Sequence, residues 1–386
     1  MYPFGMKRLF SFDWLLLVSA LFLLGTGLLS LYSISSETAG TSFSSSYFVR
    51  QASFAALGLV LMTVLAFLDY RHIEKFSTTI FFLAAFLLAA VLVLGKVIRG
   101  TTGWIALGPV NFQPVEGAKI ALILFLASFI SRKTSELGEW VRIVASLVLS
   151  SLFIFLVMRQ PDLGSAIVLS AIWGGMIVAS GIRVKHVLVL LVLGVVIATS
   201  GWFFLAGYQR DRLTVFIHPE RDPRGSGYNV LQAMVAVGSG GVFGKGVGYG
   251  SQSQLNFLPE KHTDFIFAVI GEELGLFGVG LLFFAYGTLF YRIYRIGRDA
   301  RDNFGYLVAL GSFIFFAVQV TINVGMNVGL LPVTGLPAPF LSYGGSSLLA
   351  SFALIGILLS VSRRGKEKFS IQSLSLDEES EIHLRV

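Results

Sequence analysis

Apolar segments about as long as a membrane is thick recur along the chain, separated by short polar connections. Crossing ~30 Å of hydrocarbon takes about 20 helical residues. Ten such runs are present, at 13–33, 51–68, 77–95, 115–131, 141–158, 163–182, 187–206, 264–290, 305–330 and 344–362. The pattern therefore predicts an all-α, polytopic integral membrane protein with about ten transmembrane helices.

Two parts of this pattern have a second interpretation. Only residues 159–162 separate the fifth run from the sixth, so one merged or re-entrant segment is the competing count. The first run follows Lys7 and Arg8 as a signal peptide would, but it is long and has no clear cleavage site. We expect it to be retained as an anchor.

Composition supports the membrane class. Of the residues, 55% are hydrophobic and 13% charged, and the mean hydropathy is +0.77, which leaves no evident soluble domain of ordinary size. The absence of cysteine excludes disulfides and thiolate metal sites. The five histidines are scattered without metal-ligand spacing, so no metal site built from protein side chains is predicted.

The distribution of lysine and arginine predicts the orientation. If the N-terminus is cytoplasmic, most of the 29 cations fall in inner connections, and the outer connections at 34–48 and 331–343 have none. Both termini are then cytoplasmic, and residues 365–386, rich in acidic side chains, form a solvated, disordered tail. The net charge of +7 reports this topology and gives no indication of nucleic acid binding.

The longest connection, residues 207–263 between the seventh and eighth runs, is too long for a plain linker. It carries cations against the topological bias, and a substrate bearing phosphate would need such fixed positive charge. The alternative is a long external loop that is simply polar. The cations of interest here are Arg210, Arg212, Lys245 and Lys261.

Within this loop, the glycine-rich stretch 238–250 suggests a phosphate-binding loop around Lys245. However, Ser239 occupies the first required glycine position, and Gly246 replaces the Ser or Thr that would hold magnesium. We therefore reject a nucleotide site. The glycines instead indicate close backbone approach and positive φ, and a half-buried re-entrant turn is equally open.

Acidic residues at three predicted helix starts are candidate site residues. Glu116 and Lys119 lie three residues apart and share a helix face, either as a local capping pair or as part of a binding site. Asp162 is either an N-cap or a ligand of the substrate. Asp264 opens the eighth run, where it is either a cap or a catalytic carboxylate.

Eight and nine residues after Asp264, the same run contains Glu272 and Glu273. Two carboxylates inside a spanning helix are costly unless they have partners. We expect this pair to bind cations or backbone groups of the bundle.

Taken together, the motifs resemble those of the SEDS family (shape, elongation, division and sporulation). The resemblance covers one domain, residues 1–364, and rests on three pieces. These are QPDLGSA at 160–166, LPEKHTDFIFAVIGEELG at 258–275, and NVGMNVGLLPVTGLP with SYGGSS between 323 and 347. Three positions depart from the family pattern, namely Gly103, Val115 and Ala338.

The resemblance implies a peptidoglycan glycosyltransferase that polymerises lipid II at the outer face of the bacterial cytoplasmic membrane. It also implies a class B penicillin-binding protein as partner, other membrane proteins of the elongation complex, and a role in cell elongation and shape. The family's essential acid falls on Asp264. The substrate-binding positions it implies are Trp104, Glu116, Lys119, Asp162 and Ser342, and Arg99 is the candidate substitute for the cation missing at Gly103.

This chemistry needs a base for the acceptor sugar hydroxyl and positive charge for a departing lipid diphosphate. Asp264 is the expected base, and the loop cations, with or without Mg²⁺ or Mn²⁺, are the expected neutralising charge. Three alternatives stay open: a lipid II flippase or transporter, a non-catalytic scaffold of the cell-wall synthesis complex, and the family's division role.

Overall fold

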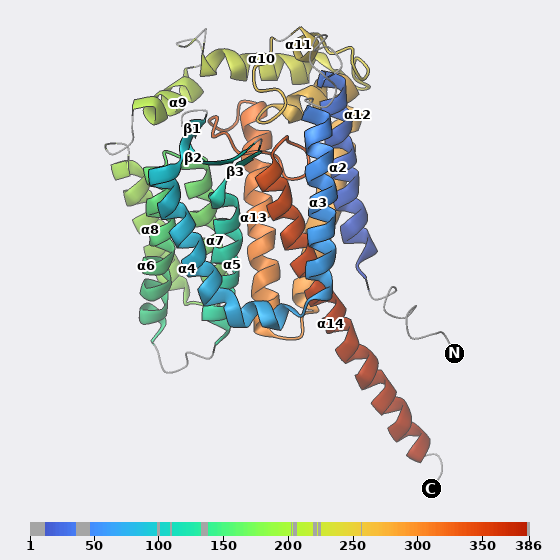
Figure 1. The fold of residues 1–386 in the computed structure, drawn as a ribbon. Helices are drawn as coiled ribbons and strands as arrows, with labels where there is room; N and C mark the ends of the chain where they lie inside the picture. Colours follow the sequence, from blue (N-terminus) through green and yellow to red (C-terminus); the bar gives the residue numbers. More distant parts are fainter. Residues whose placement is uncertain are drawn as a thin grey trace.

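The computed structural model describes residues 12–35, 47–98, 101–108, 110–132, 138–201, 203, 207–218, 222, 225–255 and 257–383. Long helices form a bundle, and short helices lie across one end of it (Figure 1). Within the described residues, eight helices are long and apolar enough to cross a membrane. They are α2 (Trp14–Ser35), α3 (Tyr47–Phe67), α4 (Tyr70–Leu94), α5 (Pro114–Ser131), α6 (Glu139–Arg159), α12 (Ile266–Arg298), α13 (Asn303–Asn327) and, over Gly345–Gly365, α14 (Gly345–His383).

Two shorter apolar helices, α7 (Leu163–Ala179) and α8 (Val184–Gly201), match the remaining predicted runs, so the polytopic helical class is confirmed. The merged count of the fifth and sixth runs is wrong, because α6 and α7 are separate helices that pack against each other. Pro161 has no N–H to continue a helix, and the Asp162 side chain accepts a hydrogen bond from Ser165 N at 2.9 Å, starting a new one.

A small antiparallel sheet is the feature that the all-α prediction missed. Its strands are β1 (Lys96–Ile98), β2 (Thr101–Leu107) and β3 (Val110–Phe112), in the order β1-β2-β3. Gly108, with φ of 64°, turns the chain between β2 and β3. β1 and β3 have three residues each, too few for a period-2 signal, and the seven residues of β2 do not alternate between apolar and polar, which is why hydropathy alone did not reveal them.

Burial separates central helices from peripheral ones. In α5, α12, α13 and α14, between 61% and 89% of the most apolar window is buried, whereas in α3, α4 and α6 the share is 22–28%. The peripheral helices turn apolar side chains outward, as a lipid-facing helix does. The polar residues of the central helices therefore lie inside protein, away from lipid.

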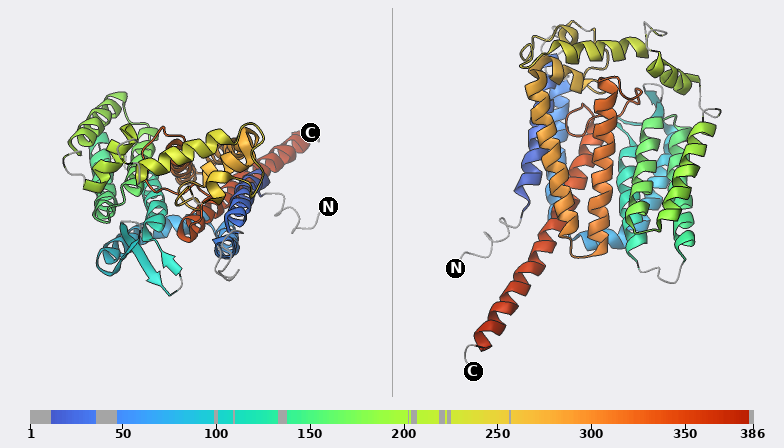
Figure 2. Two further views of the ribbon diagram at one scale, coloured as in Figure 1. Left: turned by 90° about the horizontal axis from the view of Figure 1, so that it is seen from above. Right: turned by 180° about the vertical axis from the view of Figure 1, so that it is seen from behind.

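The two ends of the bundle differ. At one end lie α9 (Gly207–Ile217), α10 (Ser226–Ser239), α11 (Ser251–Gln254) and the glycine loop 240–250, which we call the cap (Figures 1 and 2). At the other end α2 begins and α14 leaves the bundle; we call this the tail end. α14 is continuous to His383, and the prediction of a disordered tail from residue 365 stays a prediction.

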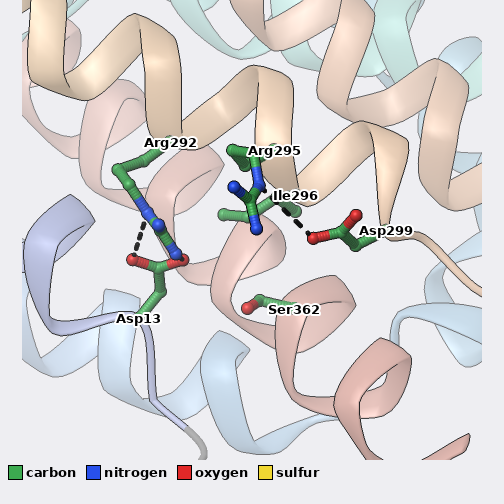
Figure 3. A pocket seen from close by; sticks show the side chains of 6 residues that line it. All are labelled: Asp13, Arg292, Arg295, Ile296, Asp299 and Ser362. Atoms are coloured by element: carbon green, nitrogen blue, oxygen red, sulfur yellow. Dashed lines mark hydrogen bonds and ion pairs between the residues drawn. The ribbon is translucent and has the colours of Figure 1, made fainter. Parts of the chain in front are cut away.

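At the tail end, α2 is tied to α12 by a buried ion pair. Asp13 accepts hydrogen bonds from Arg292 Nε at 2.9 Å and from Nη2 at 2.5 Å. Figure 3 shows this pair in a small pocket, where Arg295 also faces Asp299 at 3.6 Å. Because each arginine faces a carboxylate, the charges of the pocket largely cancel.

At the cap end, the Ser33 hydroxyl of α2 donates a hydrogen bond to Glu273 Oε1 of α12 at 2.6 Å. The residues between Asp13 and Ser33 span about 30 Å at ~1.5 Å per residue, which equals the thickness of the hydrocarbon layer. Trp14 and Tyr32 are exposed beside these two ties, as in the aromatic belts of membrane proteins. The two ties thus lie about one hydrocarbon thickness apart along α2.

Candidate active site

Asp264 lies in a turn that leads into α12 at the cap end. Its backbone carbonyl accepts hydrogen bonds from the side-chain amides of Asn323, at 3.2 Å, and Asn327, at 2.9 Å, one turn apart on α13. Asn327 also accepts a hydrogen bond from Ala268 N at 3.0 Å. The main chain at Asp264 is therefore fixed from α13, while its side chain is partly exposed.

The capping interpretation of Asp264 is wrong. α12 begins at Ile266 with Phe265 as the N-cap residue, and no side chain caps it. The Thr263 hydroxyl donates instead to the Glu260 carbonyl at 3.3 Å. The Asp264 carboxylate therefore does not cap α12, and its predicted role as a base stays a prediction.

The loop 331–344 passes directly beside Asp264. Ser342 Oγ donates to the Thr263 carbonyl at 2.6 Å and accepts from Ala338 N at 2.8 Å. A Cβ atom at Gly335, whose φ is 76°, would lie 3.6 Å from Asp264 Oδ2. Ser342, predicted to bind substrate, is thus buried between two backbone segments and holds the loop against the turn that carries Asp264.

On its other side, the same loop contacts the start of α7. A Cβ atom at Gly164 would meet the Thr334 carbonyl at 3.0 Å and Leu336 Cγ at 2.9 Å. Asp162 caps α7 at this point, so the N-cap interpretation of Asp162 is confirmed; its role in binding substrate stays a prediction. The loop brings the QPD and HTDF motifs, far apart in the sequence, to one place.

Glu116 and Lys119 form a buried ion pair near the start of α5. Lys119 Nζ lies 2.8 Å from Glu116 Oε1, and the lysine side chain is 0% exposed. Among the described residues, the second carboxylate oxygen of Glu116 has no hydrogen-bond partner. Gln113 N donates to Ser346 Oγ at 3.0 Å, which joins the start of α5 to the start of α14, just after loop 331–344.

Glu272 and Glu273 bind the cap, as expected for structural carboxylates. Glu272 accepts from Lys245 Nζ at 2.8 Å and from the Gln252 and Ser253 backbone N–H groups at 2.9 and 3.0 Å. Glu273 accepts from Ser33, from Gln254 and from Gly248 N. Lys245, 29% exposed, is therefore engaged in an ion pair, and neutralisation of a diphosphate by it stays a prediction.

The glycine loop approaches α12 as its composition predicts. α12 breaks at Gly275, with φ of 65° and ψ of −164°. Lys245 N and Gly246 N donate to the freed carbonyls of Glu272 and Glu273, each at 3.0 Å. Added Cβ atoms at Gly240 and Gly244 would clash with the backbone of α12, so only glycine fits.

The other predicted substrate residues occupy separate places. Lys261 is buried, and its Nζ donates to the Ser253 carbonyl, while Trp104 lies half-buried on β2 opposite Lys96. Arg210 Nη2 donates to the Phe203 carbonyl at 2.8 Å, and Arg212 lies beside it on α9. Arg99 lies outside the described residues. For these residues a role in binding substrate stays a prediction.

Sequence reasoning did not select three polar residues that position the site. They are Gln51 on α3, which exchanges hydrogen bonds with Ser342 O at 3.0 Å and Gly344 N at 3.2 Å, and the two asparagines of α13. The signal was present, because an amide inside a spanning segment is costly unless it is bonded. A stack of His262 on Tyr47, with ring centroids 4.1 Å apart, also joins α3 to the turn.

Within the part of the chain that the structure describes, protein side chains alone form no metal centre. Among the described residues, no group of three or more His, Cys, Asp or Glu side chains gathers in a way that could hold a metal ion. A divalent cation would therefore depend on oxygen atoms of the substrate for most of its ligands. The predicted Mg²⁺ or Mn²⁺ stays a prediction.

These features define a multi-pass membrane protein with a carboxylate-bearing turn fixed at one end of its bundle, and the chain is similar to known membrane proteins. The family model for FtsW, RodA and SpoVE, described as "Cell cycle protein", matches residues 13–367. The chain is 39% identical over 360 residues to stage V sporulation protein E of Bacillus subtilis, covering 91% of this chain and 97% of that protein. It is 41% identical over 313 residues to the peptidoglycan glycosyltransferase MrdB of Escherichia coli, covering 81% and 84%.

Solved structures agree with the sequence relatives. One, described as "Structural coordination of polymerization and crosslinking by a peptidoglycan synthase complex", has a TM-score of 0.78 at 31% identity and covers 92% of this chain and 98% of that one. The rod shape determining protein RodA of Thermus thermophilus has a TM-score of 0.68 at 29% identity, with 91% and 97% covered. The chain belongs to the FtsW/RodA/SpoVE family, the SEDS family that its motifs indicated.

Proposed function

We propose that this protein is a peptidoglycan glycosyltransferase that polymerises lipid II, with Asp264 as the general base. Relatives named peptidoglycan glycosyltransferases support the enzyme class. We also propose a role in cell elongation; the likeness to MrdB and RodA supports it, and the likeness to relatives named FtsW supports division equally. Replacement of the host's elongation or division polymerase by this chain would tell the two roles apart.

The observation that carries the proposal is the depth of Asp264. Asp302, which caps α13 and accepts from Tyr70 OH at 2.7 Å, lies at the tail end, and Asn323 holds Asp264 at the cap end. The stretch of α13 between them is about 21 residues, or about 30 Å, one hydrocarbon thickness. The carboxylate thus stands at the level of lipid headgroups, where a lipid-linked sugar diphosphate presents its sugars.

In the proposed reaction, Asp264 takes the proton of an acceptor sugar hydroxyl as that oxygen attacks the anomeric carbon of the donor. A carbon–oxygen bond forms there, the bond to the diphosphate oxygen breaks, and the lipid diphosphate leaves with the electron pair. Helices α5, α7, α12 and α14 all begin at the cap end and direct the positive ends of their dipoles there. The buried Lys119 and the cations of the cap add positive charge for the leaving group.

The orientation, membrane and partners belong to the same proposal. The tail end carries exposed arginines such as Arg183 and Arg298, which supports a cytoplasmic tail end and an outward cap in the bacterial cytoplasmic membrane. A class B penicillin-binding protein is the proposed partner, and the structural relative from a complex that polymerises and crosslinks supports it. Other elongation-complex proteins stay a prediction.

The test is whether the purified chain alone, in detergent with lipid II, makes glycan polymer that moenomycin does not inhibit. We expect polymer. A flippase would move lipid II across vesicles without lengthening glycan, and a scaffold would do neither. Absence of polymer from folded, monodisperse protein, with lipid II translocation in vesicles, would establish the transporter instead.

A further inference from the structure

The cap carries apolar side chains that face outward just above the bundle. Phe243, at the tip of the glycine loop, is 82% exposed, and Leu276, just after the break in α12, is 67% exposed. Val242 and Phe277 are also exposed. Backbone hydrogen bonds join the glycine loop to the start of the second part of α12: Leu276 N donates to Gly241 O at 2.9 Å, and Phe277 N donates to Val242 O at 3.0 Å. The four side chains therefore form one patch, which we call the tip patch.

Backbone hydrogen bonds hold the loop that carries this patch against α12. Its backbone exchanges hydrogen bonds with α12 on both sides of Gly275, and Gly244 N donates to Gly240 O at 2.8 Å. Lys245, the one charge of residues 240–250, turns toward Glu272 at 2.8 Å. A turn that is hydrogen-bonded to α12 on one side and presents apolar side chains on the other can enter the boundary between headgroups and acyl chains.

The tip patch lies close to the Ser33–Glu273 tie at the cap end. Glu273 is bonded to Ser33, the neighbour of the exposed Tyr32. Leu276 and Phe277 follow Glu273 just after the break at Gly275, where the second part of α12 starts toward the tail end. Below them, the exposed face of α12 continues through Leu281 and Phe284, so the tip patch is continuous with the lipid-facing surface of that helix.

We propose that the tip of the glycine loop, Val242 and Phe243, inserts into the lipid leaflet at the cap end and anchors the cap to the membrane surface. The partner is the bilayer itself, at the boundary between headgroups and acyl chains. The anchor holds the loop and the first half of α12, which follows Asp264, at the level of lipid headgroups. In this proposal, the tip is the half-buried re-entrant turn that was one of the two interpretations of the glycine-rich stretch.

The absence of cysteine allows a direct test. Phe243→Cys gives a single site for a nitroxide spin label, and its large exposure means that packing does not change. The labelled chain, alone in vesicles of phosphatidylethanolamine and phosphatidylglycerol, is examined by power saturation with oxygen, which concentrates in lipid, and a nickel chelate, which stays in water. Phe284→Cys is the lipid reference, and Arg183→Cys, at a side chain 68% exposed, is the water reference.

We expect the label at 243 to collide preferentially with oxygen, close to the value at 284, and a label at Val242→Cys to do the same. Nickel-dominated relaxation at both positions, close to the value at 183, would overturn the proposal. It would indicate a patch above the lipid, left bare for a partner's apolar helix. The readout is spectroscopic, so it does not depend on whether Asp264 is catalytic.

Discussion

The buried ion pair of α5 offers a sharp test of whether the polar interior serves function or folding. Lys119→Met leaves the Glu116 carboxylate in a buried site where one of its oxygens already lacks a partner among the described residues. Breaking a buried pair from one side costs about 3–5 kcal/mol, because the remaining charge is uncompensated. Replacing both members by neutral groups of similar shape costs little or nothing.

We therefore expect Lys119→Met to lose about 3–5 kcal/mol of unfolding free energy, and Glu116→Gln with Lys119→Met to recover to within about 1 kcal/mol of the wild type. Unfolding of the wild type and the two variants in mixed micelles, followed by circular dichroism, gives these free energies. Lipid II polymerisation by the same three proteins gives the second readout. We expect the double variant to be folded and inactive, because it removes both polar groups that the substrate site is proposed to use.

Two outcomes would refute this reasoning. If Lys119→Met is as stable as the wild type, the pair is solvated and the burial argument fails. If the double variant is both stable and fully active, the pair only supports the helix start, and its assignment to the substrate site is wrong.

Three further predictions concern the support of the site. Asn327→Leu, which removes the bond to the Asp264 carbonyl, should lower kcat about tenfold or more with little change in KM for lipid II; a rise in KM alone would contradict a positioning role. Gly275→Ala should lower the free energy of unfolding by about 1–3 kcal/mol, because a φ of 65° suits only glycine. Gly280→Ala, in open space on the same helix, is the control and should not destabilise the protein. Equal shifts of the melting temperature in the two variants would contradict the break in α12. Burial raises the pKa of Asp69, but a backbone N–H bond and two arginine charges outweigh it and hold that pKa below its usual value. The loss of thermal stability in Asp69→Asn should therefore be full at neutral pH and disappear as the pH falls through that lowered pKa. A loss that does not depend on pH would contradict this prediction.

The helices were predictable because lipid imposes one simple requirement, a length of continuous apolar helix, and each run such as 305–330 meets it alone. The partners of Glu272 and Glu273 were predictable in kind, since a carboxylate in a spanning helix must be bonded. Their identity was not, because Ser33 lies 240 residues away from Glu273. Tertiary contacts of that separation leave no periodic trace in the sequence.

The candidate site, too, was predictable only in part. The motif around Asp264 selected the residue as a candidate, and the structure adds how its main chain is fixed. Asparagine side chains from α13 and Ser342 from loop 331–344 hold the carbonyls of Asp264 and Thr263. The structure did not place the two loop lysines as their charge alone suggested. Lys245 and Lys261 were chosen for charge alone, and both point at protein acceptors. Charge counts along a loop do not report where a flexible side chain finds its partner.

The most direct measurement is lipid II polymerisation by purified Asp264→Asn, which keeps the shape of the side chain and the backbone bonds from α13 but removes the base. Asp299→Asn, in the pocket at the opposite end of the bundle, is the matched control. We predict no polymer from Asp264→Asn at a melting temperature equal to that of the wild type, and full activity from the control. Polymer from Asp264→Asn at the wild-type rate would contradict the central claim that this carboxylate takes the proton of the acceptor sugar.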